Sequence, residues 1–486
     1  MSVSMQAAVS PHSGGTPPAG EARLPRRLRT SDLTMLLLVA VVNVNLVPAV
    51  AGAPGGMALW AAALLCFFVP QAVAVLELSA RDPSEGGVYV WTRGAFGPAH
   101  ALVCGWCYWV NNLFYVPTVI LYLVGIVLHA AGGSALESDP RVMVPAVLAV
   151  LWALTGLNVL GFGVSRWLQN AGAVCTLLAT AAVAGLSAAI LASRAGPPQA
   201  ASSSAVAWGS IPFFGITCLA LVGLELGSVV GGEVRQPRRA IPRAVVGAGA
   251  ACAAVYLLST VALAAAVPHA EIGALSGWLQ AAERLAGAAG AAMLTLPLAA
   301  VLAVSAAAAA CVWMAGAARM PFVMGLDRLL PAPLARTHHR WGTPATALVV
   351  QGAASSVLVL FSASGSSIRE AYLLLLNATA VIQLIVFLYL FAIVVRAPAG
   401  RVHGFFTRPG VYRIAGGVGL AATAAAIVSA LVPPDGVQAD ARYAAKLLGA
   451  TAAFLLPGIV LAFRQRTRLG VTAPEPLKPG ASLPAA

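Results

Sequence analysis

A series of long apolar runs limits the folds open to this chain. A helix needs about 20 mostly apolar residues to cross a bilayer. Twelve such segments follow one another, near 33–53, 57–79, 98–130, 142–162, 166–193, 208–231, 241–267, 288–316, 344–362, 370–395, 411–432 and 442–463. Charged residues are 9% of the total, whereas soluble domains carry roughly 25%. The sequence therefore predicts an all-α membrane protein with a twelve-helix domain over 32–464.

The two ends of the chain differ from this domain in composition. Residues 1–31 are rich in Ser, Pro and Gly and end in a basic cluster, which predicts a disordered tail. The apolar run that follows is too long for a signal-peptide core, so we expect an uncleaved first helix. Residues 465–486 predict a second tail. A surface amphipathic helix is expected between Ile272 and Leu285, where apolar residues recur at helical spacing.

The basic residues indicate how the helices are oriented. The formal net charge is +13, from 29 Lys and Arg against 16 Asp and Glu. In a soluble chain this excess would suggest a nucleic-acid partner. Here most basic residues fall in the tails and in alternate loops, the pattern of cytoplasmic segments. We expect a multi-pass protein of the cytoplasmic (plasma) membrane, with both termini cytoplasmic and no nucleic-acid partner.

Several enzyme and cofactor classes lack their usual signatures. Lys446 and Lys478 are the two lysines, and neither follows a Gly-rich loop, so a phosphate-binding Walker A motif is absent. The histidines fall in tails, loops or helix ends, which argues against a metal site at mid-membrane. Cys104 and Cys107 have redox spacing, but packing is favoured because no βαβ pattern surrounds them. We predict no catalytic residue, metal or cofactor, and a membrane-embedded enzyme is a distant alternative.

Two of the apolar segments are interrupted. In the first, two amides in Val41–Asn45 precede Pro48, which has no N–H for the carbonyl of Val44. In the sixth, Glu225 stands between Gly223 and Gly227. The segments are five helices apart, and a five-helix repeat inverts its second copy. Glycine and proline also serve helix packing, but interruptions at matching positions of inverted repeats favour a transporter's binding site.

The chemistry of these breaks suits a zwitterion. Freed N–H groups attract a carboxylate, and freed carbonyl groups attract an ammonium. An ionised Glu225 at mid-bilayer costs about 2.5–3.5 kcal/mol. We therefore expect this side chain to face a cavity or to take up a proton.

Three blocks of sequence resemble the amino acid–polyamine–organocation (APC) superfamily of permeases. The first is Glu77-Leu78, then Asp82-Pro83-Ser84-Glu85-Gly86-Gly87-Val88-Tyr89-Val90-Trp91 and Ala95-Phe96-Gly97. The second is Glu233-Val234-Arg235-Gln236-Pro237 through Pro242. The third, similar to the loop after the family's helix eight, runs from Arg319 through Gly325-Leu326-Asp327-Arg328-Leu329-Leu330-Pro331 to Pro344. They occur in the family's order, and the resemblance covers nearly all of 33–463. Within the superfamily, Tyr108-Trp109-Val110-Asn111-Asn112 and the proline-bearing first helix resemble the glutamate/GABA antiporter-like branch most.

The resemblance implies two inverted five-helix repeats plus two C-terminal helices, with substrate held where helices one and six unwind. Carried over to this chain, the unwound residues are Val41, Val42, Asn43, Val44, Asn45, Leu221, Val222 and Gly223. Glu225 matches a family glutamate linked to proton sensing. The family usually has G-S-G in helix one, whereas Val41-Val42-Asn43 stands here. These bulkier residues put the usual carboxylate cradle in question.

Further polar and aromatic residues are candidates for the substrate path. Trp313 matches a substrate-stacking tryptophan of arginine/agmatine antiporters, although tryptophan is also common at membrane interfaces. Asn111, Asn112 and Tyr115 on helix three and Asn377 on helix ten could hydrogen-bond a substrate. Buried amides also join neighbouring membrane helices, and both readings stay open.

The resemblance and the two breaks favour a secondary transporter that moves amino acids by alternating access, as a permease or an antiporter. A permease for polyamines or other organic amines is the alternative. The expected partners are a small-molecule amino acid or amine and the lipid bilayer, and assembly into a homo-oligomer is left open. The segment 166–193 has no lysine, so the lysine that some proton-coupled relatives carry on helix five is missing.

Overall fold

The computed structural model describes residues 26–53, 55–131, 139–193, 211–266, 278–279, 283–284, 295–363, 368–397, 404–432 and 441–468. Over these residues the chain is helical and has no strand, apart from an isolated bridge between Leu28 and Val234. Most of the stretch expected to form a surface amphipathic helix, 272–285, lies outside the described residues. So do most of the two predicted tails.

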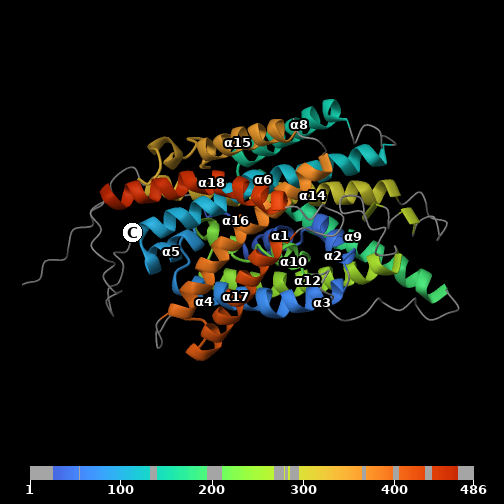
Figure 1. The fold of residues 1–486 in the computed structure, drawn as a ribbon, viewed down its shortest axis with the longest axis horizontal. Helices are drawn as coiled ribbons and strands as arrows, with labels where there is room; N and C mark the ends of the chain where they lie inside the picture. The colour runs from blue at the N-terminus through green and yellow to red at the C-terminus, as the bar shows by residue number, and fades with distance from the viewer. Residues whose placement is uncertain are drawn as a thin grey trace, which may run out of the picture.

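The helices follow the order of the predicted segments (Figure 1). Their bounds are α1 Thr30–Val41, α2 Val47–Ala51, α3 Gly56–Ala63, α4 Val69–Arg81, α5 Val88–Phe96, α6 Pro98–Ala130, α8 Pro140–Val159, α9 Phe162–Ser193, α10 Phe213–Ala220, α11 Leu226–Val229, α12 Pro237–Ala266, α14 Thr295–Leu326, α15 Ala345–Ala363, α16 Ile368–Arg396, α17 Pro409–Ala430 and α18 Ala441–Arg468. A π-helical turn, Leu64–Phe68, joins α3 to α4. Short 3-10 turns lie at Val44–Leu46, Gly231–Glu233 and Ala332–Ala335.

Nine helices within the described residues are long and apolar enough to cross a membrane. The first and sixth predicted segments are missing from that set because each is broken into shorter helices, α1 with α2 and α10 with α11. The ninth segment forms α15, a shorter apolar helix. The all-helical membrane fold is thus confirmed, and the count of twelve spans stays a prediction.

Two boundaries differ from the expectation. Helix α14 continues to Leu326, ten residues beyond the predicted end at 316, because Arg319 lies buried inside it and forms an ion pair with Glu233. Residues 88–96, expected as part of a loop, form helix α5, whose side chains Val88 and Tyr89 pack into the core.

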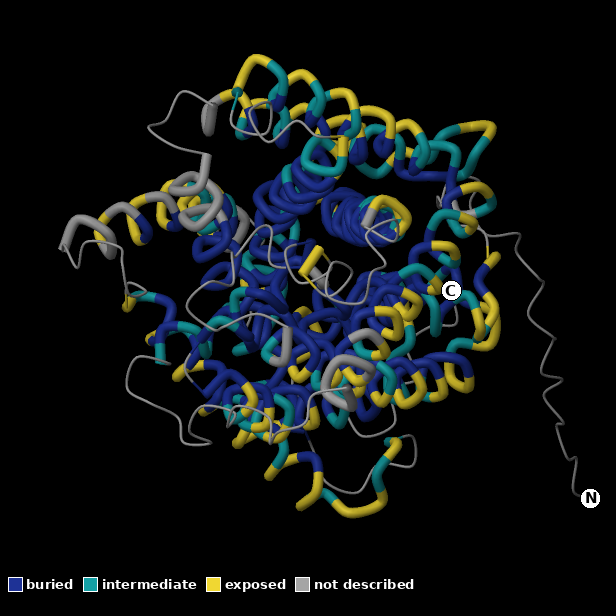
Figure 2. Tube along the Cα trace, turned by 90° about the vertical axis from the view of Figure 1, so that its right-hand side faces the viewer, coloured by how far each residue is buried: buried dark blue, intermediate teal, exposed yellow. Residues whose placement is uncertain are grey.

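Residues at the centre of the bundle are buried, and the exposed residues lie mostly at its rim (Figure 2). Many of the exposed residues are large and apolar. Helices α1 and α10 are drawn near the middle of the bundle (Figure 1). Helix α1 packs against α9, α12 and α14, and α10 packs against α16 and α17. Leu65 and Ile414 are 69% and 70% exposed, and such apolar surfaces suit contact with lipid.

Several loops meet at one end of the bundle. The N–H of Arg27 donates to the carbonyl of Glu233 at 2.9 Å, and Arg319 Nε donates to Glu233 Oε1 at 2.6 Å. Arg93 Nη1 donates to Asp327 Oδ1 at 2.5 Å. We call this the arginine-rich end, defined by Arg27, Arg93 and Arg319. It joins loops that the charge pattern predicts on one side of the membrane.

Candidate substrate site

The first broken helix unwinds immediately after Val41. Val42 leaves the helical region, with φ −79° and ψ 91°, and a 3-10 turn follows at Val44–Leu46. Pro48 lies in the first turn of α2, where its missing N–H does not interrupt the ladder. The break therefore falls at Val42 and Asn43, within the predicted unwound residues.

The second broken helix passes directly against the first. Helix α10 ends at Ala220 and α11 begins at Leu226. Between them Gly223 has φ +137°, a region that side chains with a Cβ rarely adopt. A Cβ at this position would lie 3.0 Å from the carbonyl carbon of Ala40. Glycine thus permits the two backbones to touch at the breaks.

Asn43 joins the two breaks. Its Nδ2 donates to the carbonyls of Val41 at 3.2 Å and Ala220 at 3.1 Å, and its Oδ1 accepts from the Tyr115 hydroxyl. Its backbone N–H donates to Tyr256 Oη at 2.9 Å. A predicted substrate ligand therefore has its amide group engaged with the protein's own backbone.

Glu225 is fully buried and receives donors from three elements. The N–H of Gly223 and Nε2 of Gln71 each donate to Oε2 at 3.0 Å. The Tyr108 hydroxyl lies 3.4 Å from Oε1. Because all three groups are hydrogen-bond donors, the surroundings of this side chain suit an ionised carboxylate. Glu225 thus places an ionisable side chain at the breaks.

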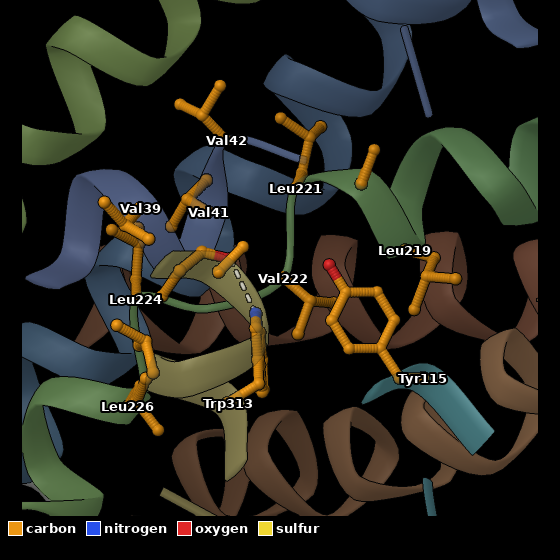
Figure 3. Close-up of a cluster of buried hydrophobic side chains, with 14 of the residues drawn as sticks. Val39, Val41, Val42, Tyr115, Leu219, Leu221, Val222, Leu224, Leu226 and Trp313 are labelled. Carbon is orange, nitrogen blue, oxygen red and sulfur yellow. Dashed lines mark hydrogen bonds between the residues drawn. The ribbon is translucent and has the colours of Figure 1, made fainter. Parts of the chain in front are cut away.

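Trp313 on α14 closes the breaks from another side. Its Nε1 donates to the carbonyl of Ala40 at 3.0 Å, as the dashed line in Figure 3 shows. The ring centroids of Tyr115 and Tyr108 lie 5.6 and 6.2 Å from that of Trp313. Trp313 is buried against the first break rather than exposed at an interface.

The side chains around the breaks are otherwise apolar. Figure 3 shows aliphatic groups from helices one and six beside Trp313 and Tyr115. They are Val39, Val41, Val42, Leu219, Leu221, Val222, Leu224 and Leu226, all buried. Of Val44 the structure describes the backbone alone. The breaks are therefore lined mainly by apolar side chains, with the carboxyl group of Glu225 beside them.

The remaining predicted amides are buried at other places. Asn112 Nδ2 donates to the carbonyl of Tyr108 at 2.9 Å. The Oδ1 atoms of Asn111 and Asn112 and the Nδ2 of Asn45 have no hydrogen-bond partner among the described residues. Asn377 is buried in α16, which packs against α6 and α10.

The site predicted from the sequence did not include three residues that lie at the breaks, Gln71, Tyr108 and Tyr256. Tyr108 stood in the quoted helix-three motif without a role at the site. Gln71 is an amide within an apolar run, which was a usable signal. Tyr256 has no such signal, because tyrosine is an ordinary residue in an apolar helix. Among the described residues, no group of three or more His, Cys, Asp or Glu side chains is placed to hold a metal ion.

The fold and several sequences resemble those of known transporters. The crystal structure of MhsT in complex with L-phenylalanine matches with a TM-score of 0.58 at 12% identity, over 91% of this chain and 100% of that one. An uncharacterized transporter of Legionella pneumophila is 25% identical over 84% of this chain and 90% of its own length. A probable agmatine/putrescine antiporter of Lactococcus lactis is 22% identical over 47% of this chain and 49% of its own.

A family model described as amino acid permease matches residues 28–451. The family and these relatives are transporters, so the prediction of a multi-pass membrane transporter that is not an enzyme is confirmed. Because the match spans most of the chain, the protein belongs to the amino acid permease family, within the APC superfamily.

Proposed function

We propose that this secondary transporter moves amino acids across the cytoplasmic membrane by alternating access, with the substrate held at the two helix breaks. The observation that carries the proposal is the contact of the breaks themselves, where Gly223 lies against Ala40 and Glu225 is buried beside them. Broken helices at matching positions of inverted repeats form the binding sites of such transporters.

Each predicted site residue has a role in this proposal. The segments Val41–Asn45 and Leu221–Gly223 supply backbone groups and apolar surface to the substrate. Trp313 and Tyr115 cover its side chain. The unpartnered amide oxygens of Asn111 and Asn112, together with Asn377, belong to the polar part of the substrate path.

The placement in the cell belongs to the proposal as well. The arginine-rich end faces the cytoplasm, and both termini are cytoplasmic, because basic loops are retained on that side. The proposal includes the glutamate/GABA antiporter-like branch, and the helix-three motif and the proline-bearing first helix support it.

An organic amine without a carboxylate is the second candidate substrate. The N–H of Asn43 donates to Tyr256 Oη, and the N–H of Gly223 donates to Glu225. Two donors that could bind a substrate carboxylate are therefore engaged. Glu225 is a natural partner for an ammonium group. The relative named as a probable agmatine/putrescine antiporter is of this substrate class.

Counterflow in proteoliposomes tests both candidates. The panel pairs each amino acid with the amine that lacks its carboxylate: arginine with agmatine, ornithine with putrescine, and phenylalanine with phenethylamine. Each pair is assayed with and without a pH gradient, and protein-free liposomes give the background.

Exchange of an amino acid in preference to its paired amine is the expected result. Preference for the amine within a pair replaces the first candidate by the second. No exchange of any compound by correctly inserted protein overturns the proposed transport of amino acids and amines.

A further inference from the structure

Tyr256 lies where α12 meets both broken helices. The residue is fully buried, and its hydroxyl accepts from the N–H of Asn43 at 2.9 Å. The same hydroxyl is within hydrogen-bond distance of two carbonyl oxygens, those of Val41 and Ala220. One side chain of a third helix thus contacts the last residue of α1 and the last residue of α10.

These two carbonyls are among those that the breaks deprive of helical partners. In an unbroken helix the carbonyl of Val41 would accept from residue 45, and that of Ala220 from residue 224. The Tyr256 hydroxyl and Asn43 Nδ2 approach both oxygens instead. The backbone N–H of Asn43 also donates to the carbonyl of Val41, at 2.9 Å. The Tyr256 hydroxyl has one proton and can donate to one of the two carbonyls at a time. Asn43 Nδ2 has two hydrogens and can donate to both carbonyls.

The ring of Tyr256 is held in place independently of its hydroxyl. It stacks on the fully buried Trp60 of α3, with 4.3 Å between centroids and 24° between planes. Replacement by phenylalanine therefore retains the packing and removes the hydrogen bonds alone.

We propose that Tyr256 is a positioning residue that ties the two breaks to each other, so that they keep one relative geometry while the substrate is bound. The inference rests on the proposed transport function for its effect on substrate. Its structural part, a mechanical link between the breaks, can be tested without any substrate.

Tyr256→Phe tests the link, with Tyr389→Phe as the matched control. The Tyr389 hydroxyl pairs with His100 at 3.2 Å near the start of α6. That position is 15 residues before Tyr115 along the helix, or about 22 Å. Hydrogen exchange is measured on the intact protein in detergent for residues 42–46 and 221–225.

In Tyr256→Phe, hydrogen exchange is expected to become about tenfold faster in both 42–46 and 221–225. In Tyr389→Phe it should change in neither segment. Unchanged exchange in either segment of Tyr256→Phe overturns the link. This result stands whether or not a substrate is known.

The second experiment measures transport kinetics by counterflow, with a compound that the wild-type protein exchanges. Tyr256→Phe is expected to raise KM about tenfold with a much smaller change in maximal rate, because a buried hydrogen bond that positions the site is lost. A merely structural role would lower thermal stability and leave the KM of the folded fraction unchanged. That outcome, or a fall in maximal rate alone, overturns the role in substrate binding.

A double-variant cycle removes the remaining ambiguity. Asn43→Ala removes the other side-chain hydrogen bonds that join Val41 and Ala220. The double variant should therefore raise KM no further than the larger of the two single effects. Additive effects would contradict one shared tie. If the wild-type protein transports none of the compounds in counterflow, the proposed function fails. The hydrogen-exchange experiment still decides whether Tyr256 links the two breaks.

Discussion

At the scale of single residues, Glu225 distinguishes this site from plain helix packing. It is fully buried in a break, and its oxygens receive donors from Gly223, Gln71 and Tyr108. A carboxyl group with such partners can hold a charge inside the membrane, or can carry a proton that it releases when a substrate ammonium arrives. We propose that this proton release is part of the transport cycle.

Glu225→Gln should therefore flatten the pH dependence of substrate affinity between pH 5 and 8. Glutamine has nearly the same shape, and it does not titrate. Its amide oxygen can accept from Gly223 and Gln71, while its NH2 group can donate to the Tyr108 hydroxyl. Substrate binding measured by calorimetry across this range checks the prediction. Glu77→Gln, which removes a carboxyl paired with Arg81 away from the breaks, should keep the wild-type profile. An unchanged profile in Glu225→Gln would count against a titrating role.

The sequence predicted some of these residues and not others, for a physical reason. Asn43 and Glu225 are conspicuous because polar groups are costly in an apolar segment. Their partners are ordinary residues brought together from far away: 213 positions separate Asn43 from Tyr256, and 154 separate Gln71 from Glu225. Spacing along one helix carries no information about such pairs.

At the scale of elements, the two breaks depend on one glycine contact. Gly223 has φ +137°, and its Cα faces the backbone of Ala40 at the end of the first helix. Gly227, four residues later, lies inside helix α11. A Cβ there would be 3.5 Å from the side chain of Leu37, an ordinary contact.

These two glycines form a matched pair for mutation. Gly223→Ala should lower the free energy of unfolding by more than about 1 kcal/mol, because alanine is strained at positive φ and its Cβ would meet Ala40 at 3.0 Å. Gly227→Ala should be neutral or slightly stabilising, since alanine favours helix. Thermal unfolding of both purified variants checks this, and equal melting temperatures would refute the proposed close approach.

Helix positions were more predictable than helix ends. Apolar runs located the described spans because membrane thickness fixes their length. The run that ends near 316 gave the wrong end for α14, because Arg319 in the sequence looks like the start of a loop. Its partner Glu233, 86 residues earlier, lets the helix continue with the arginine buried.

At the scale of the whole molecule, the charge pattern and the fold agree on one distinct end. Thr343 Oγ1 donates to the carbonyl of Val159 at 2.7 Å, so α8 ends near the loops of the arginine-rich end. Arg141 lies at the start of α8, which has 20 residues, and is therefore about 30 Å away along the helix. The two ends should face opposite sides of the membrane.

Single cysteines at the two ends test this orientation. Arg238 and Arg141 are both exposed. In a background without Cys66 and Cys175, the two cysteines that are not fully buried, Arg141→Cys should react with an impermeant maleimide in intact cells. Arg238→Cys should react only after the cells are permeabilised. The reverse pattern would invert the proposed topology.

We expect Glu85 to make the closure of the arginine-rich end depend on pH. Its side chain is packed near Arg319, with 4.0 Å between Nε and Oε1. Burial, and then the nearby Glu233, raise the pKa of Glu85 from 4.5 to about 8, against the opposing effect of Arg319. If this end opens, Glu85 meets water and its pKa returns toward the ordinary value.

The closed arrangement therefore binds the Glu85 proton more tightly than the open one does. Its advantage is complete below about pH 4.5, declines as the pH rises, and changes no further above about pH 8. Spin labels at Arg26 and Arg328, two exposed positions of this end, should show a growing long-distance population between pH 5 and 8. Glu85→Gln should remove most of this rise, and Asp82→Asn in the same loop should retain it. If the rise persists in Glu85→Gln, another group controls this end of the molecule.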